Sequence, residues 1–252
     1  MGLGALVLAS LFIVPWGWLL LVIPAICVGV SELSRAFAAG RFRVPLIPVM
    51  VGTVAMHVGA YLGGGPGLMM AFGLTLLAVV TWRSVLGIDH AARDVTAGVF
   101  VVAYAPFLAA FTTLMLRAED GPMRIAVFII VTICSDIGGY AVGVLAGRHP
   151  MAPSVSPKKS WEGLAGSAAS CVVAGMLTVP LMLGGSIVAG AVLGLVTVAL
   201  ATLGDLTESM LKRDLGIKDL GELLPGHGGL MDRIDSLLVT APGAWLVLTL
   251  LV

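Results

Sequence analysis

Charged residues are scarce in this chain of 252 residues. Lys, Arg, Asp and Glu make up 11% of it and hydrophobic residues 59%, whereas soluble domains average roughly 25% charged residues. This composition excludes an ordinary soluble domain and indicates a membrane protein with several spans. Fourteen basic and fourteen acidic residues give a formal net charge of zero. Because a strongly basic face is missing, we expect no nucleic-acid partner.

The chain also has few cysteines and no exact internal repeat. Cys27, Cys134 and Cys171 lie in apolar segments without CxxC or His spacing. We therefore expect small buried side chains, not a disulfide framework or a zinc site. The lack of an exact repeat weakens an inverted-repeat transporter hypothesis. A basic segment followed by a cleavage site is also lacking, so residues 3–14 predict a retained span instead of a signal peptide, and the abrupt start suggests a missing tail.

Apolar segments fill most of the chain. A helix needs about twenty apolar residues to cross a bilayer core of roughly 30 Å, and on that scale we predict nine spans. They are residues 2–14, 16–37, 44–62, 66–82, 95–116, 122–146, 160–183, 186–211 and 234–252. A single tilted helix through Pro15 would fuse the first two, leave eight spans and move the amino terminus to the other side.

Basic residues are distributed unevenly between the two sets of loops. Lys and Arg favour short cytoplasmic loops. With the amino terminus inside, one side holds twelve basic residues and the other only Arg117 and Arg124. The twelve are Arg35, Arg41, Arg43, Arg83, Arg93, Arg148, Lys158, Lys159, Lys212, Arg213, Lys218 and Arg233. We therefore expect the polar motifs to face the cytoplasm.

The main polar stretch, residues 205–235, holds half of the Asp and Glu residues. Helical spacing places Asp205, Ser209 and Lys212 on one face at the end of the eighth span. A glycine loop follows, and its glycines allow positive φ and close backbone approach to a ligand. Asp232 and Asp235 come after that loop. Hard oxygen ligands beside cations and such a loop suit a metal bound to phosphates.

The run SMLKRDLGIKDLGELLPGHGGLMDRID, residues 209–235, resembles the signature of phosphatidate cytidylyltransferases, integral membrane enzymes that make CDP-diacylglycerol from CTP and phosphatidic acid. The matching residues are Ser209, Lys212, Arg213, Lys218, Asp219, Gly221, Pro225, His227, Gly228, Gly229, Asp232, Arg233 and Asp235. The resemblance implies that CTP and phosphatidic acid are the substrates. It also implies a homodimer.

Asp205 and Asp232 are our candidate metal ligands, because folding the glycine loop back would bring them together. The alternative is a pair of solvated or salt-bridged interfacial acids. The resemblance implies Mg²⁺ here, with a second cation such as K⁺ shared between the carboxylates. We expect Asp219 and Asp235 to orient neighbouring basic residues. Asp136, deep in the sixth span, is a further catalytic candidate, although a helix–helix hydrogen bond would also explain it.

A second polar island, SPKKSWEG, covers residues 156–163. Capping of the next helix explains Ser160 and Glu162, and positive-inside anchoring explains Lys158 and Lys159. A helix start beside lysines is also an anion site. The segment resembles the family's PKK-SWEG motif, which, with Trp161, favours contact with the nucleotide.

The basic residues of the main stretch, Lys212, Arg213, Lys218 and Arg233, are expected to divide between the pyrophosphate and the lipid phosphate. We expect His227 to bond a phosphate or to order the loop. Other polar residues have simpler interpretations. Glu32 and the group Asp89, His90, Arg93 and Asp94 are expected to be structural, and His57 a hydrogen-bonded core residue.

The sequence thus predicts an all-α polytopic protein, with residues 1–252 forming one membrane-embedded domain. Residues 2–116 would supply five helices, and residues 122–252 the catalytic helices and loops around a cavity open to the cytoplasm. We expect the membrane to be a bacterial inner membrane. Two alternatives stay open, namely a CTP-dependent lipid-alcohol kinase and an ion-coupled transporter using Asp136 and Asp205.

Overall fold

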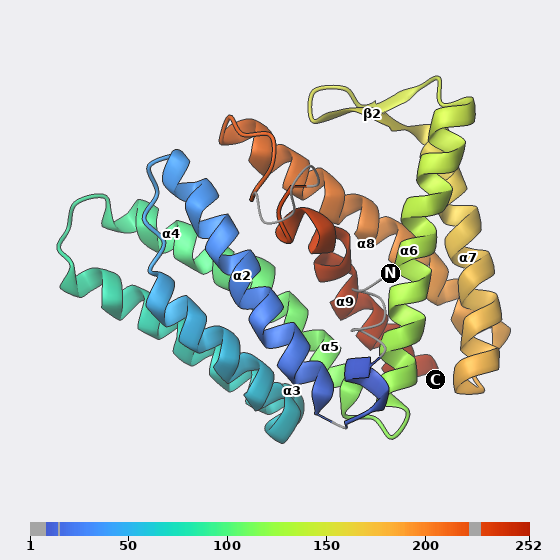
Figure 1. The fold of residues 1–252 in the computed structure, drawn as a ribbon, viewed down its shortest axis with the longest axis horizontal. Helices are drawn as coiled ribbons and strands as arrows, with labels where there is room; N and C mark the ends of the chain where they lie inside the picture. Colours follow the sequence, from blue (N-terminus) through green and yellow to red (C-terminus); the bar gives the residue numbers. More distant parts are fainter. Residues whose placement is uncertain (1–8, 15, 222–227) are drawn as a thin grey trace. The chain divides into compact units, whose positions relative to one another are not determined.

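The computed structural model describes residues 9–14, 16–221 and 228–252, and most of them are helical (Figure 1). The chain divides into two compact units. The first unit comprises Met1–Ala118 with Leu215–Arg233, and the second comprises Glu119–Asp214 with Ile234–Val252. The division near residue 118 falls between the predicted fifth and sixth spans. Residues 215–233, part of the main polar stretch, belong to the first unit.

The first unit contains α2 (Gly17–Ala39), α3 (Leu46–Val85), α4 (Ala91–Val102), the π-turn η1 (Ala103–Phe107) and α5 (Leu108–Leu116). The π-turn contains Pro106, which has no N–H and would break a regular α-helical hydrogen-bond ladder. The wider turn lets α4, η1 and α5 continue as one apolar element, Ala91–Leu116. This element covers the single predicted span 95–116.

Helix α3 is a hairpin of two antiparallel helices. Gly64 lies inside it with a φ of 64° and a ψ of −147°, outside helical values, and Pro66 follows. The two halves approach closely, because a Cβ on Gly59 would lie 2.7 Å from the carbonyl oxygen of Gly67. The predicted spans 44–62 and 66–82 fall in the two halves.

The second unit contains α6 (Gly121–Ala146), β1 (Pro150–Ala152), β2 (Ser156–Ser160), α7 (Trp161–Leu183), α8 (Ile187–Asp214) and the larger part of α9 (Met231–Leu251) (Figure 1). Small residues bring its helices together. A Cβ on Gly166 of α7 would lie 2.6 Å from the carbonyl oxygen of Gly138 in α6. Backbones in such close contact are typical of membrane helix pairs.

Among the described residues, seven helices are long and apolar enough to cross a membrane. They support an all-α polytopic membrane protein. The expected number of nine is not reproduced as such, because α3 holds two of the predicted spans, and most of the first, 2–14, lies outside the described residues. The connection between α6 and α7 also departs from a purely helical architecture.

That connection forms a two-stranded antiparallel hairpin, β1 with β2. Pro157 disfavours helix for the residue before it and removes one backbone donor. Ser160 is still extended, with a φ of −122° and a ψ of 157°, and its side chain accepts from the Gly163 backbone N–H at 3.1 Å. The predicted helix start at Ser160 is therefore confirmed, and the hairpin lies directly before it.

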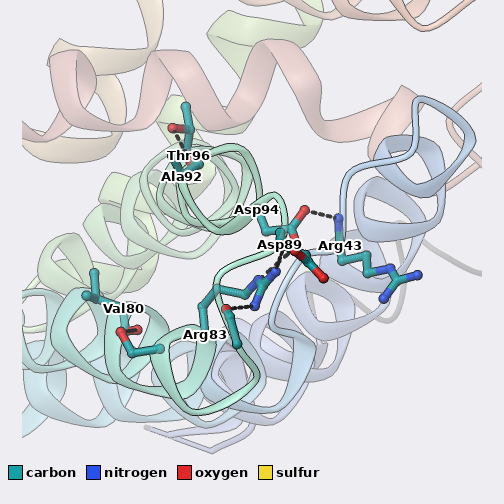
Figure 2. Close-up of polar contacts among 9 residues, drawn as sticks. Arg43, Val80, Arg83, Asp89, Ala92, Asp94 and Thr96 are labelled. Atoms are coloured by element: carbon teal, nitrogen blue, oxygen red, sulfur yellow. Dashed lines mark hydrogen bonds and ion pairs between the residues drawn. The ribbon is translucent and has the colours of Figure 1, made fainter.

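A buried ion pair fastens the first unit (Figure 2). Arg83 Nε lies 2.9 Å from Asp94 Oδ2, and the two side chains are 8% and 2% exposed. The backbone N–H of Arg43 also donates to Asp94 at 2.8 Å. Arg83 further donates to the carbonyl oxygens of Gly87 and Asp89. This geometry confirms the structural interpretation of Asp94.

His57 is fully buried, and its Nδ1 lies 2.9 Å from the carbonyl oxygen of Thr53. The prediction of a hydrogen-bonded core histidine is confirmed.

Candidate active site

The ion pair between Lys159 and Asp205 is central to the second unit. Lys159 lies in β2, directly before its last residue, and Asp205 lies on α8, so the pair joins residues 46 positions apart. Nζ of Lys159 donates to Oδ2 of Asp205, and the side chains are 27% and 32% exposed. Partial exposure leaves both groups accessible to a ligand. A lysine from the PKK-SWEG motif thus meets a predicted metal ligand.

Two further acids, both of them sequence-predicted site residues, join this pair. The carboxyl group of Asp235 lies within electrostatic reach of that of Asp205. Asp136 on α6 lies within electrostatic reach of Asp235 and Lys159. Three carboxyl groups against one lysine make an environment that a cation would stabilise, since like charges close together repel.

The start of α7 gives structural partners to Ser160 and Glu162. Ser160 caps the helix, as described above. Glu162 Oε2 accepts from the backbone N–H groups of Arg148 and His149 at 3.1 and 3.2 Å, and its Oε1 lies 2.5 Å from His149 Nδ1. These contacts close the hairpin onto α7. Lys158 and Trp161 are exposed, and their predicted contact with nucleotide stays a prediction.

The carboxyl-terminal part of α8 carries the basic residues Lys212 and Arg213. Lys212 Nζ lies 3.1 Å from Oε1 of Glu208, whose side chain is 4% exposed. Arg213 Nε donates to the carbonyl oxygen of Val155, in the turn of the hairpin, at 3.4 Å. The end of α8 and the hairpin are therefore joined at two points, by Arg213 and by Lys159. Ser209 lies on the same helix and is half-buried.

In the first unit, backbone donors hold the side chain of Asp232. Its Oδ2 accepts from the N–H groups of Gly229 at 2.8 Å and Leu220 at 3.0 Å. Gly228 has a φ of 80°, and a Cβ on it would lie 3.1 Å from Asp232 Oδ2 and 3.5 Å from Asp219 Oδ1. Glycine adopts this conformation without strain and leaves room between the two carboxylates. The positive φ predicted for the glycine loop is thus present at Gly228, and close approach of the loop to a ligand stays a prediction.

The remaining sequence-predicted residues of this stretch are placed as follows. Lys218 and Arg233 are exposed, and His227 lies outside the described residues. Within 9–14, 16–221 and 228–252, no group of three or more His, Cys, Asp or Glu side chains has the arrangement of a metal site. Asp205 belongs to the second unit and Asp232 to the first, so their shared ligation of a cation stays a prediction.

Sequence reasoning missed the position of Glu32, which was expected to be an interfacial structural residue. It is buried in α2, and its carboxylate accepts from the backbone N–H groups of Leu230 and Met231 beside Asp232. The available signal was an acid within an otherwise apolar helix.

Comparison with known proteins identifies the family of the chain. Residues 1–251 match the cytidylyltransferase family. The chain is 40% identical over 265 residues to the phosphatidate cytidylyltransferase of Mycobacterium bovis, covering 100% of this chain and 86% of that protein. It is 39% identical to the Mycobacterium leprae protein of the same name, with the same coverage. It is also 36% identical to that of Haemophilus influenzae, covering 69% of this chain and 54% of that protein. The chain therefore belongs to the cytidylyltransferase family.

Proposed function

We propose that this protein transfers the cytidylyl group of CTP to phosphatidic acid, giving CDP-diacylglycerol and pyrophosphate for phospholipid biosynthesis. The observation that carries this proposal is the similarity, over the full length of the chain, to proteins named phosphatidate cytidylyltransferase. The helices long and apolar enough to span a membrane suit a lipid substrate. The relatives favour neither the lipid-alcohol kinase nor the transporter.

The reaction is a displacement at phosphorus. A phosphate oxygen of phosphatidic acid attacks the α-phosphorus of CTP and forms a new P–O bond. The bond from the α-phosphorus to the oxygen bridging to the β-phosphate breaks, and its electron pair leaves with pyrophosphate. The attacking group is already an anion, so no general base is needed. Catalysis of this kind depends on alignment and charge neutralisation.

In this proposal Asp205 and Asp232 would hold Mg²⁺, which would neutralise charge on the triphosphate. Two carboxylates suffice, because Mg²⁺ usually keeps several waters and takes its other ligands from substrate phosphates. The proximity of the Asp205, Asp235 and Asp136 carboxyl groups, whose like charges repel, supports a cation here. A second cation such as K⁺ would share the same carboxylates.

The basic residues neutralise phosphate charge in this proposal. Lys159 would contact the nucleotide phosphates, with Lys158 beside it. The ion pair with Asp205 supports this role, because it places Lys159 beside a predicted metal ligand. Lys212, Arg213, Lys218 and Arg233 divide between the pyrophosphate and the lipid phosphate.

The setting of the enzyme is part of the proposal. Twelve of the fourteen basic residues fall on one side of the predicted spans, which supports a cytoplasmic active site. In this proposal the protein also lies in the bacterial inner membrane and forms a homodimer.

The test is an assay on protein purified in detergent, with Mg²⁺, phosphatidic acid and CTP labelled at the α-phosphorus. We expect label in the lipid product and release of pyrophosphate. Label found only in a soluble nucleotide, with phosphate transferred to a lipid alcohol, would identify a kinase. Substrate flux in sealed vesicles without CTP would identify a transporter.

A further inference from the structure

Glu32 is a buried carboxylate with two long-range partners. Glu32 is 3% exposed and lies within the apolar helix α2, where an unpaired carboxylate would be costly. Oε1 accepts from the backbone N–H of Leu230 at 3.0 Å, and Oε2 accepts from that of Met231 at 2.9 Å. These two partners lie 198 and 199 positions after Glu32 in the sequence. Each oxygen of this acid therefore has a backbone donor.

These donors belong to the start of α9, whose first residue is Met231. The first N–H groups of a helix have no acceptor within that helix. They also form the positive end of the helix dipole, where an anion is stabilised. Glu32 therefore caps α9 from a different element of the chain. This capping explains how a carboxylate can be buried in α2.

Two glycines leave the space that this carboxylate occupies. A Cβ on Gly229 would lie 2.6 Å from Oε2 of Glu32, and a Cβ on Gly221 would lie 2.7 Å from its Cγ. Real Cβ atoms do not approach other atoms so closely. Any larger residue at either position would push the carboxylate away from α9.

Asp232 uses the neighbouring donors of the same short segment. Besides the Leu220 N–H, it accepts from the Gly229 N–H of this segment, while Glu32 accepts from the next two N–H groups, at positions 230 and 231. The two carboxylates thus hold three consecutive N–H groups, those of residues 229 to 231. A shift of this backbone would move the donors that orient Asp232.

We propose that Glu32 is a positioning residue, which fixes residues 229–231 and thereby aims Asp232 at the cation. The inference rests on the proposed function, in which Asp232 is a Mg²⁺ ligand. Glu32 itself touches neither cation nor substrate in this proposal.

The test is Glu32→Gln in the full-length purified protein, assayed over a range of Mg²⁺ concentrations. The amide keeps one acceptor oxygen and loses one charge-assisted hydrogen bond. We expect the Mg²⁺ concentration for half-maximal activity to rise about tenfold, because hydrogen bonds to charged groups typically contribute about that factor or more. Activity should recover substantially at saturating Mg²⁺. A merely structural role would lower the amount of active enzyme without moving this concentration.

Hydrogen exchange provides a readout that does not depend on turnover. The amides of Leu230 and Met231 should exchange faster in Glu32→Gln than in the wild type. Ser31→Ala is the matched control, since its hydroxyl donates within α2, to the carbonyl oxygen of Cys27 at 2.9 Å. It should change neither quantity.

Gly229→Ala tests the same geometry with Glu32 intact, and it decides the matter if Glu32→Gln fails to fold. We expect it to raise the Mg²⁺ requirement as well. An unchanged requirement and unchanged exchange in a folded variant would overturn the role of Glu32. Failure of the proposed function would look different: the wild-type protein would make no CDP-diacylglycerol, while the exchange measurements would still report on the contact.

Discussion

Replacing Lys159 with alanine tests two contributions of this side chain separately. One is the stability that its ion pair gives to the fold, and the other is the effect of its charge on the reaction. The ion pair with Asp205 has side chains 27% and 32% exposed. Pairs near a solvated surface contribute only about 0.2–1 kcal/mol to stability. We therefore expect the variant to keep its fold, with a loss of unfolding free energy of at most about 1 kcal/mol. If turnover falls strongly although the protein stays folded, the loss must come from the missing charge at the substrate.

The kinetic effect of Lys159→Ala should be far greater. Removing one preorganised group that stabilises transition-state charge typically costs about 2.7–4 kcal/mol, or roughly a hundred- to a thousandfold in rate. We expect a loss of that size in kcat/KM for CTP, measured by release of pyrophosphate in detergent. Lys159→Arg keeps the charge and should retain more activity than the alanine variant. Ser154→Ala, an exposed change in the turn of the hairpin, is the control.

Two outcomes would refute this reasoning. Wild-type kcat/KM in a folded Lys159→Ala protein would show that the lysine does not act on CTP. A loss of the fold itself would show that the ion pair is structural and worth more than its exposure indicates. Lys158→Ala gives a graded comparison, because Lys158 is exposed and its charge is better screened by water. We expect a smaller rise in the KM for CTP than with Lys159→Ala.

Three further predictions concern the candidate metal ligands, the buried ion pair of the first unit and a close helix contact in the second. Asp205→Asn and Asp232→Asn should each abolish CDP-diacylglycerol synthesis while the protein elutes as a folded species from size exclusion, and normal synthesis in excess Mg²⁺ would contradict the assigned ligands. Arg83→Met should lower the unfolding free energy by about 3–5 kcal/mol, because it leaves its buried carboxylate partner uncompensated; an unchanged thermal midpoint would argue against this. Gly166→Ala should cost about 1–3 kcal/mol by overpacking, whereas Gly73→Ala, with open space around its Cβ position, should be neutral in the same measurement.

Local chemistry made several features predictable. The alternation of apolar spans and polar loops follows from the length that a bilayer requires, and the structure places seven long apolar helices within the described residues. Ser160 was recognisable as a cap because a hydroxyl three residues before Gly163 can accept from its N–H. The hairpin before it was not recognised, because strands of three and five residues leave too short a periodic pattern.

Contacts between distant residues were harder to foresee. Spacing along one helix relates Asp205 to Lys212, but it cannot reveal that Lys159, from a hairpin, pairs with Asp205. Lys212 instead contacts Glu208, one turn before it, as helical spacing allows. The residue types of the site could thus be chosen from the sequence, whereas their partners depended on tertiary packing.

The case of Glu32 shows why a role can escape sequence reasoning even when the residue is noticed. An acid in an apolar helix signals a specific partner, because its charge would otherwise be unsatisfied. The sequence offers many basic residues as candidates, yet the partners are two backbone N–H groups about two hundred positions away, and backbone donors leave no trace in residue identity. The indirect trace is in the glycines, since Gly221 and Gly229 leave room for the carboxylate. Glycines in a loop can therefore report a neighbouring side chain of the protein itself as well as a bound ligand.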